Sequence, residues 1–166
     1  MDNKISKKEK SLYKPILNWL DEYLKNKNPR AKVSVYDVHS TDLSDFLQRT
    51  PFKKYFPEYS TYKIRVDLVG MVEQKGKCSL TFVEVKYGQL NLRDVSQLLG
   101  YSKIVKPEFA FLISPKGLSR PLSQLLKYFN RLDILEYKPN YYIRIARWDS
   151  SRKAILMNSV IPPFNY

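Results

Sequence analysis

Cysteine and glycine are scarce in this chain of 166 residues, which has one cysteine, Cys78, and five separated glycines. A lone thiol excludes an intrachain disulfide and the cysteine clusters of structural zinc and iron–sulfur sites. No apolar run is long enough to span a bilayer, and no apolar stretch of a secretory signal follows the basic segment 1–10. These absences predict a single domain over residues 1–166, located in the cytoplasm and not in a membrane.

Acidic residues are also few, with 16 Asp and Glu against 29 Lys and Arg, a formal net charge of +13. A compact domain with this excess repels itself, so a polyanionic partner is expected. Nucleic acid is the commonest such partner, because each neutralised phosphate releases a condensed counterion. The alternatives are a charge that serves solubility, or surface ion-pair networks of the thermophilic kind, but such networks need matching acids. The charge therefore favours nucleic acid.

Hydrophobic periodicity predicts a folded α/β chain, and the 43% hydrophobic and 14% aromatic content argues against disorder. Residues 12–24 repeat as an amphipathic helix whose regular part is expected to begin at Pro15. The other elements are expected in this order: a strand at 33–38, an irregular stretch at 41–60 with Asp42 as a helix cap, strands at 62–72 and 80–87, a helix at 92–105, a buried strand at 109–113, a helix at 119–135 with Ser119 as its cap, and strands at 141–148 and 154–161.

The segment Thr81-Phe82-Val83-Glu84-Val85-Lys86-Tyr87 places an acid and a base inside an apolar strand. Side chains alternate along a strand, so Glu84 and Lys86 share one face while Val83 and Val85 enter the core on the other. Charges in such a run are costly unless they are paired or bind something. An ordinary ion pair on a half-exposed strand is the alternative to a catalytic role.

Asp67 is a second acid among apolar neighbours, in Ile64-Arg65-Val66-Asp67-Leu68-Val69. If the two strands form a hairpin, Asp67 and Glu84 lie side by side, and their repulsion raises one carboxyl pKa unless a cation compensates. Oxygen ligands without nearby His or Cys favour Mg²⁺ or Mn²⁺ over zinc. Such a cation can polarise a phosphate and lower the pKa of an attacking water, and its charge is expected to lower the pKa of Lys86.

These residues resemble the signature of the PD-(D/E)XK nuclease superfamily, which includes restriction endonucleases, Holliday-junction resolvases and RecB-type exonucleases. The resemblance covers roughly residues 9 to 113. Gln97-Leu98-Leu99-Gly100-Tyr101 is similar to the Gln–apolar–x–x–Tyr helix motif of RecB-type nucleases, and Glu9-Lys10-Ser11-Leu12-Tyr13-Lys14-Pro15-Ile16 looks like the acidic first helix of small restriction-like proteins. Val66 stands where the family name has proline. The cysteine cluster of the CRISPR-associated branch is missing.

The resemblance implies a restriction endonuclease-like αβββαβ core, with a mixed central sheet flanked by helices. It implies that Asp67 and Glu84 bind the metal, that the backbone carbonyl of Val85 completes the inner shell, and that Lys86 is the catalytic lysine. Gln97 and Tyr101, four apart on one helical face, would orient the phosphate or the lysine. Glu9 would bind metal directly or through water, although an acid at a helix start is also an ordinary dipole partner.

Other candidates rest on weaker patterns. Lys53, Lys54, Lys63, Arg65 and Lys103 lie near the predicted site in sequence and are the candidates for phosphate contacts, against the alternative of a solvated basic face. The lone histidine, His39, is interpreted as a satisfied or exposed loop residue.

The sequence thus predicts a Mg²⁺- or Mn²⁺-dependent nuclease that hydrolyses phosphodiester bonds of DNA, with RNA less favoured. Cutting of duplex DNA would favour a symmetric homodimer. Two rivals remain open: a catalytically inactive nucleic-acid-binding module with this fold, and a basic subunit of a larger DNA-processing complex.

Overall fold

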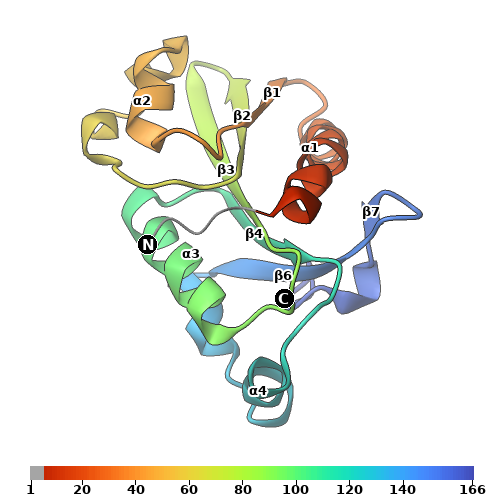
Figure 1. The fold of residues 1–166 in the computed structure, drawn as a ribbon. Helices are drawn as coiled ribbons and strands as arrows, with labels where there is room; N and C mark the ends of the chain where they lie inside the picture. The colour runs from red at the N-terminus through yellow and green to blue at the C-terminus, as the bar shows by residue number, and fades with distance from the viewer. Residues whose placement is uncertain (1–5) are drawn as a thin grey trace.

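A computed structural model of the chain describes residues 6–166, which fold into a mixed sheet of seven strands with helices on both of its faces (Figure 1). The strands are β1 (Lys32–Asp37), β2 (Leu68–Gln74), β3 (Lys77–Val85), β4 (Phe109–Ser114), β5 (Glu136–Lys138), β6 (Tyr141–Asp149) and β7 (Ala154–Ile155). The helices are α1 (Lys7–Lys27), α2 (Leu43–Gln48), α3 (Leu92–Val105) and α4 (Arg120–Ser123), with short 3₁₀ or π turns η1 (Pro51–Tyr55), η2 (Tyr59–Thr61), η3 (Gln124–Tyr128), η4 (Leu132–Leu135) and η5 (Met157–Ser159).

The strand order is β1-β2-β3-β4-β6-β5, with β7 paired to β6. Strand β2 runs antiparallel to both β1 and β3, whereas β4 runs parallel to both β3 and β6. A parallel neighbour needs a crossover connection, and α3 supplies it between β3 and β4. The mixed α/β class predicted from the order of elements is therefore confirmed.

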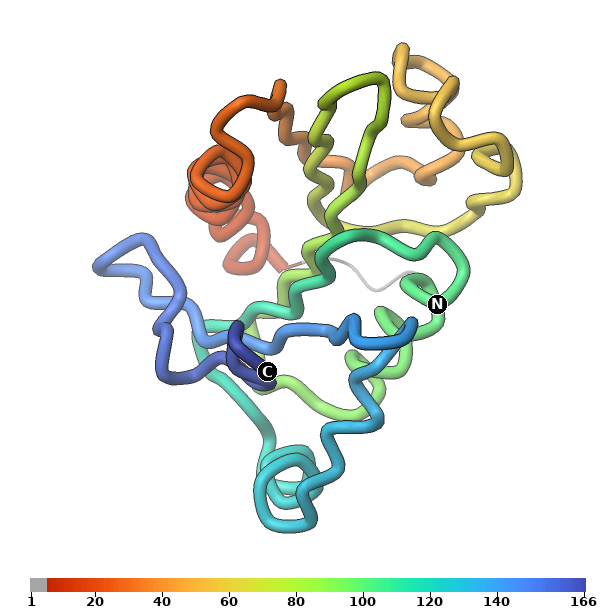
Figure 2. The backbone as a smooth tube through the Cα atoms, turned by 180° about the vertical axis from the view of Figure 1, so that it is seen from behind, coloured from red at the N-terminus to blue at the C-terminus, as the bar shows by residue number. Residues whose placement is uncertain are grey.

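Two hydrophobic clusters cover the two faces of the sheet. Helix α1 packs Ile16, Leu20 and Leu24 against a cluster that includes Val83 and Val85 of β3. The opposite cluster holds α3, α2 and alternate residues of the same strands, such as Phe82. The tube view shows α1 and α3 on different sides of the strands (Figure 2). Because β3 is covered on both faces, a charged side chain near its end lies in a partly desolvated position.

Helix α1 begins earlier than the sequence indicated. Ser6 caps it by accepting from the N–H of Glu9 at 3.1 Å, and the helix continues through Pro15 to Lys27. Buried residues on both sides of the proline, Tyr13 and Ile16 among them, hold the helix against the sheet. Tertiary packing thus outweighs the hydrogen bond that proline cannot make. The extra turns bring Glu9 and Tyr13 to the sheet.

The β2–β3 hairpin is shifted relative to the expected strands. Residues 62–67 are not part of β2, β3 begins at Lys77 rather than at residue 80, and the turn is the two-residue Lys75-Gly76, both at positive φ. Such a two-residue turn suits the twist of paired strands. Gly70 of β2 allows close packing, because a Cβ there would collide with Leu24 of α1.

The predicted helix over 119–135 is wrong beyond its first turns. Ser119 caps α4 as expected, but the chain passes into the π turn η3 and reverses at Asn130, which has a φ of 52°. The strand expected at 154–161 is reduced to β7 and an isolated bridge from Ile161 to Ile145. By contrast, α3 has the predicted bounds, fixed by a reciprocal cap between Asn91 and Asp94. No helix within residues 6–166 has the length and apolarity needed to cross a membrane.

Candidate active site

Asp67 and Glu84 meet where β2 begins and β3 ends. The antiparallel register pairs Leu68 with Val83, and one further step places Asp67 opposite Glu84. Both residues are only 6% exposed. The hairpin predicted from the sequence therefore does bring the two acids together, and it does so in a nearly dry environment.

Asp67 joins three elements through its carboxylate. Its Oδ1 accepts from the hydroxyl of Tyr13 on α1 at 2.9 Å, and its Oδ2 accepts from the backbone N–H of Val85 at 2.8 Å. These donors favour the charged form, but burial outweighs them and raises the pKa of Asp67. The carboxylate takes up the Val85 N–H at the point where the β2–β3 ladder ends, so the strands separate without leaving a buried donor unpaired.

Glu84 has an oxygen without a partner. Its Oε1 accepts from Nζ of Lys86 at 3.0 Å, whereas its buried Oε2 has no hydrogen bond. Burial, with the charge of Asp67 as the next cause, raises the pKa of Glu84 to about 8. A buried acceptor of this kind costs free energy unless something else binds it.

Lys86 lies just beyond β3, with its side chain 26% exposed. Desolvation lowers its pKa, but the attraction of Glu84, Asp67 and other acids outweighs desolvation, and the net shift is upward. The sequence-based expectation of a lowered pKa assumed a neighbouring divalent cation, and the protein groups alone act in the opposite direction. Lys86 is therefore charged at neutral pH in this arrangement.

Glu9 reaches the same corner from the first turn of α1. Its Oε2 accepts from the backbone N–H of Tyr87 at 3.2 Å, which ties the start of α1 to the segment that follows β3. The charge of Glu9 also contributes to the raised pKa of Asp67 and of Glu84. Glu9 is thus near the two acids, but its hydrogen bond goes to the backbone.

Gln97 and Tyr101 share a face of α3 as expected. Nε2 of Gln97 donates to the hydroxyl of Tyr101 at 3.4 Å. Among residues 6–166, no hydrogen bond connects this pair with Asp67, Glu84 or Lys86. The structure therefore brings Gln97 and Tyr101 together, without a direct hydrogen bond from either to the charged cluster in the described part of the chain.

The five basic residues proposed for phosphate contacts occupy different surroundings. Lys63 and Arg65 lie beside acids of the α2 region, with Nζ of Lys63 3.9 Å from Asp45 and Nε of Arg65 2.8 Å from Asp42. Lys53, Lys54 and Lys103 are exposed, the first two in η1 and the third in the last turn of α3. Within the described chain, the four lysines make no hydrogen bond or ion pair with the Asp67–Glu84 pair.

His39 lies closer to the site than its sequence position indicated. Its ring packs on Tyr13 with a centroid distance of 5.0 Å, and its Nδ1 lies 2.6 Å from Oδ1 of Asp37. The backbone N–H of Val38 donates to the carbonyl of Asp67 at 2.9 Å, which fixes the end of β1 there. Tyr13 was not predicted as a site residue, because its helical spacing indicates only that it lies in the core and does not indicate what its hydroxyl contacts.

The donor set suits a hard cation bound by few protein ligands. In residues 6–166, no three His, Cys, Asp or Glu side chains are grouped closely enough to hold a metal by themselves. Mg²⁺, however, commonly uses one or two carboxylates and takes its other ligands from water and phosphate. Asp67 and Glu84 supply such a pair, with Oε2 of Glu84 unpartnered.

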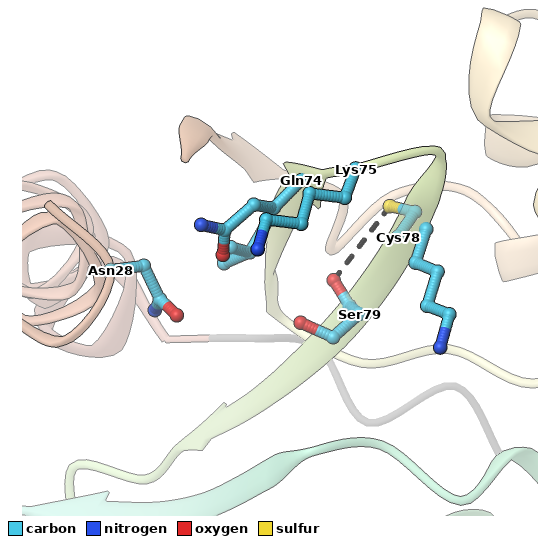
Figure 3. Close-up of a pocket in the computed structure, with 7 residues that line it drawn as sticks. Asn28, Gln74, Lys75, Cys78 and Ser79 are labelled. Atoms are coloured by element: carbon cyan, nitrogen blue, oxygen red, sulfur yellow. Dashed lines mark hydrogen bonds between the residues drawn. The ribbon is translucent and has the colours of Figure 1, made fainter. Parts of the chain in front are cut away.

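A separate hollow of about 460 Å³ lies at the other end of β3, between the end of α1 and the β2–β3 turn (Figure 3). Its lining includes Asn28, Gln74, Lys75, Cys78 and Ser79, and none of its lining residues is an acid. It has no part in the charged cluster at the opposite end of the strand.

Comparison of the chain with protein-family models, with curated proteins and with solved structures gives no match.

Proposed function

We propose that this protein is a nuclease of the PD-(D/E)XK type that hydrolyses phosphodiester bonds with Mg²⁺ or Mn²⁺. The observation that carries the proposal is the buried pair Asp67 and Glu84, which face each other across two strands while Lys86 lies 3.0 Å from one of them. Burial of two acids with one oxygen unpartnered disfavours the folded state. A bound cation would remove that cost, and an ordinary ion pair between Glu84 and Lys86 would leave Asp67 and the free oxygen unexplained.

The cation would be held by the carboxylates of Asp67 and Glu84, with the carbonyl of Val85 as a third protein ligand and Glu9 as an additional ligand through water. When bound, it would polarise the scissile phosphate and acidify the attacking water. Tyr13 and the N–H of Val85 orient Asp67, because each holds one of its oxygens. A metal-binding carboxylate that is buried and hydrogen-bonded in this way keeps its orientation when the cation binds.

Lys86 would act on the phosphate and on the water. Its ammonium is charged and half-buried, so it can offset negative charge that develops on the phosphate oxygens. It can also hold the attacking water by donating a hydrogen bond to it. Gln97 and Tyr101 would orient the substrate from α3.

DNA is the proposed substrate, because most nucleases with this signature cut DNA and because the net charge of +13 suits a polyanion. The test is to incubate the pure protein with labelled linear, circular, single-stranded and branched DNA, in Mg²⁺, in Mn²⁺ or in a chelator. The proposal requires cleavage of at least one substrate in the presence of a metal and none in chelator. The absence of cleavage with all substrates and both metals would contradict it.

A catalytically inactive nucleic-acid-binding module is the rival with a specific observation in its favour, since the carboxylate of Glu9 is turned to a backbone N–H. Cation-linked stabilisation separates the two. A nuclease should unfold at a higher temperature in Mg²⁺ or Mn²⁺, because the cation binds only the folded chain. The rival predicts the same unfolding temperature with and without the cation.

A further inference from the structure

Two lysines from distant parts of the chain converge on one aromatic ring beside the acid–lysine cluster. Nζ of Lys8, on the first turn of α1, lies 5.4 Å from the ring centre of Tyr87. Nζ of Lys116, in the segment between β4 and α4, lies 4.9 Å from the same centre. Each ammonium is attracted by the ring, but the two repel each other. The arrangement therefore concentrates positive charge at one place on the surface.

This group is held in position by backbone contacts. The N–H of Tyr87 donates to Glu9, the neighbour of Lys8 in α1. The segment that carries Lys116 is joined to the segment after Tyr87, because Oγ of Ser114 donates to the carbonyl of Gly88 and the N–H of Leu90 donates to the carbonyl of Gly117. These bonds fix three chain segments relative to one another before any ligand binds, which lowers the entropic cost of binding.

The group also adjoins the proposed catalytic residues. Tyr87 follows Lys86 directly, and the Glu9 carboxylate that holds its N–H influences the pKa of Glu84. Lys8 and Lys116 are exposed, and neither makes an ion pair with an acid within residues 6–166. Each strand of a nucleic acid carries a charge about every 3.4 Å along a duplex. A strand with one phosphate at the cluster would thus place other phosphates within reach of these lysines.

We propose that Lys8, Lys116 and Tyr87 form a binding subsite for the backbone phosphates of the nucleic-acid strand next to the bond that is cut. The two ammonium groups contact the phosphates, and the ring of Tyr87 holds both side chains at the required spacing. The proposal rests on the proposed function, because it places the strand relative to the catalytic residues. It differs from the sequence-based candidates, none of which belongs to this group.

The experiment measures equilibrium binding of a short fluorescent single-stranded oligonucleotide in chelator, so that cleavage plays no part. The double variant Lys8→Glu/Lys116→Glu is compared with Lys75→Glu/Lys77→Glu, which has the same net charge but is altered at the far end of β3. We expect the first pair to weaken binding at least about tenfold more than the second. We also expect the Lys8/Lys116 variant to show a shallower fall of log affinity with log salt, with a slope smaller in magnitude by about 1.4, the value for two single-strand phosphate contacts.

The neutral pair Lys8→Gln/Lys116→Gln is measured in parallel, and it carries the test if charge reversal prevents folding. Tyr87→Phe should bind as the wild type does, and Tyr87→Ala should bind more weakly, because only the alanine variant lacks the ring. Equal losses for both glutamate pairs, or no loss for either, would overturn the subsite. Loss confined to the Lys8/Lys116 pair in a protein that never cuts DNA would retain the subsite and reject the nuclease. If the protein cleaves DNA but substitution of Lys8 and Lys116 leaves binding unchanged, the nuclease would be retained and the subsite rejected.

Discussion

The hydroxyl of Tyr13 on α1 donates a buried hydrogen bond of 2.9 Å to the carboxylate of Asp67, which lies 54 residues further along the chain. The bond links the helix that covers one face of the sheet to the acid where β2 begins. Burial, followed by the charge of Asp67, raises the pKa of the Tyr13 hydroxyl well above its ordinary value. The hydroxyl therefore remains a hydrogen-bond donor at all physiological pH values. Asp67 is thereby oriented by a neutral group that cannot compete with it for a cation.

Replacing Tyr13 with phenylalanine should destabilise the protein by about 1.5–3 kcal/mol, the usual contribution of a hydrogen bond to a charged group. The loss should be greatest at high pH, where Asp67 is ionised, and smaller where Asp67 is protonated. Denaturant unfolding at several pH values measures the effect. The matched control is Tyr128→Phe, since Tyr128 is 81% exposed. Equal stability of the Tyr13 variant and the wild type would show that the bond has no energetic role.

Replacing Asp67, Glu84 or Lys86 with alanine should abolish Mg²⁺-dependent cleavage, because each removes a proposed cation ligand or the ammonium beside the phosphate. Binding of DNA should remain largely intact, since most of the positive surface is unchanged. Cleavage of labelled DNA and binding in chelator are measured for each variant. Lys77→Ala, at the opposite end of β3, is the control. Normal cutting by the three variants would disprove the site assignment.

Replacing Gln97 with alanine should reduce the cleavage rate less severely than the loss of Lys86. Gln97 bonds to Tyr101 rather than to the charged cluster, so its expected role is to orient substrate. Tyr101→Phe tests the same pair from the other side by removing its hydroxyl. Rates that do not change in either variant would reduce the pair to surface packing.

The stability of the cation-free protein should fall as the pH rises from 4.5, the ordinary pKa of a glutamate, to about 8, the pKa of Glu84 in the folded chain. In this window the unfolded chain ionises Glu84 and the folded chain retains the proton, so ionisation favours unfolding. The raised pKa of Asp67 acts in the same direction. Urea unfolding in chelator across this window measures the loss. Glu84→Gln should flatten the profile, and an equally steep profile in that variant would assign the dependence to other groups.

Mg²⁺ or Mn²⁺ should stabilise the folded chain most above pH 8, where Glu84 is ionised without a cation and its repulsion with Asp67 is greatest. Stabilisation should be about 2.7 kcal/mol when the free cation is at 100 times its dissociation constant. Thermal unfolding with and without the cation measures it. The Asp67→Asn/Glu84→Gln variant should show no such gain. A gain of equal size in that variant would locate the cation elsewhere.

Local patterns determined much of this protein. Alternation along β3 placed Val83 and Val85 in the core opposite Glu84, and the cap at Asn91 with Pro107 beyond the last turn bounded α3. Such features depend on neighbours a few residues apart, so they can be read from the chain. The pairing of Asp67 with Glu84 was also predictable, because a short turn joins the two strands and sets their register.

Only the tertiary structure decided which distant groups complete the site. The packing of α1 on the sheet brought Tyr13 to Asp67 and Glu9 to the N–H of Tyr87, and the parallel placement of β4 beside β3 brought Lys116 to the ring of Tyr87. The helix expected at 119–135 gives way to a π turn after Ser123, and α1 continues through Pro15 because residues on both sides of the proline are buried. Contacts between residues far apart in sequence arise from the burial of whole faces. No local periodicity encodes which side chains those faces bring together.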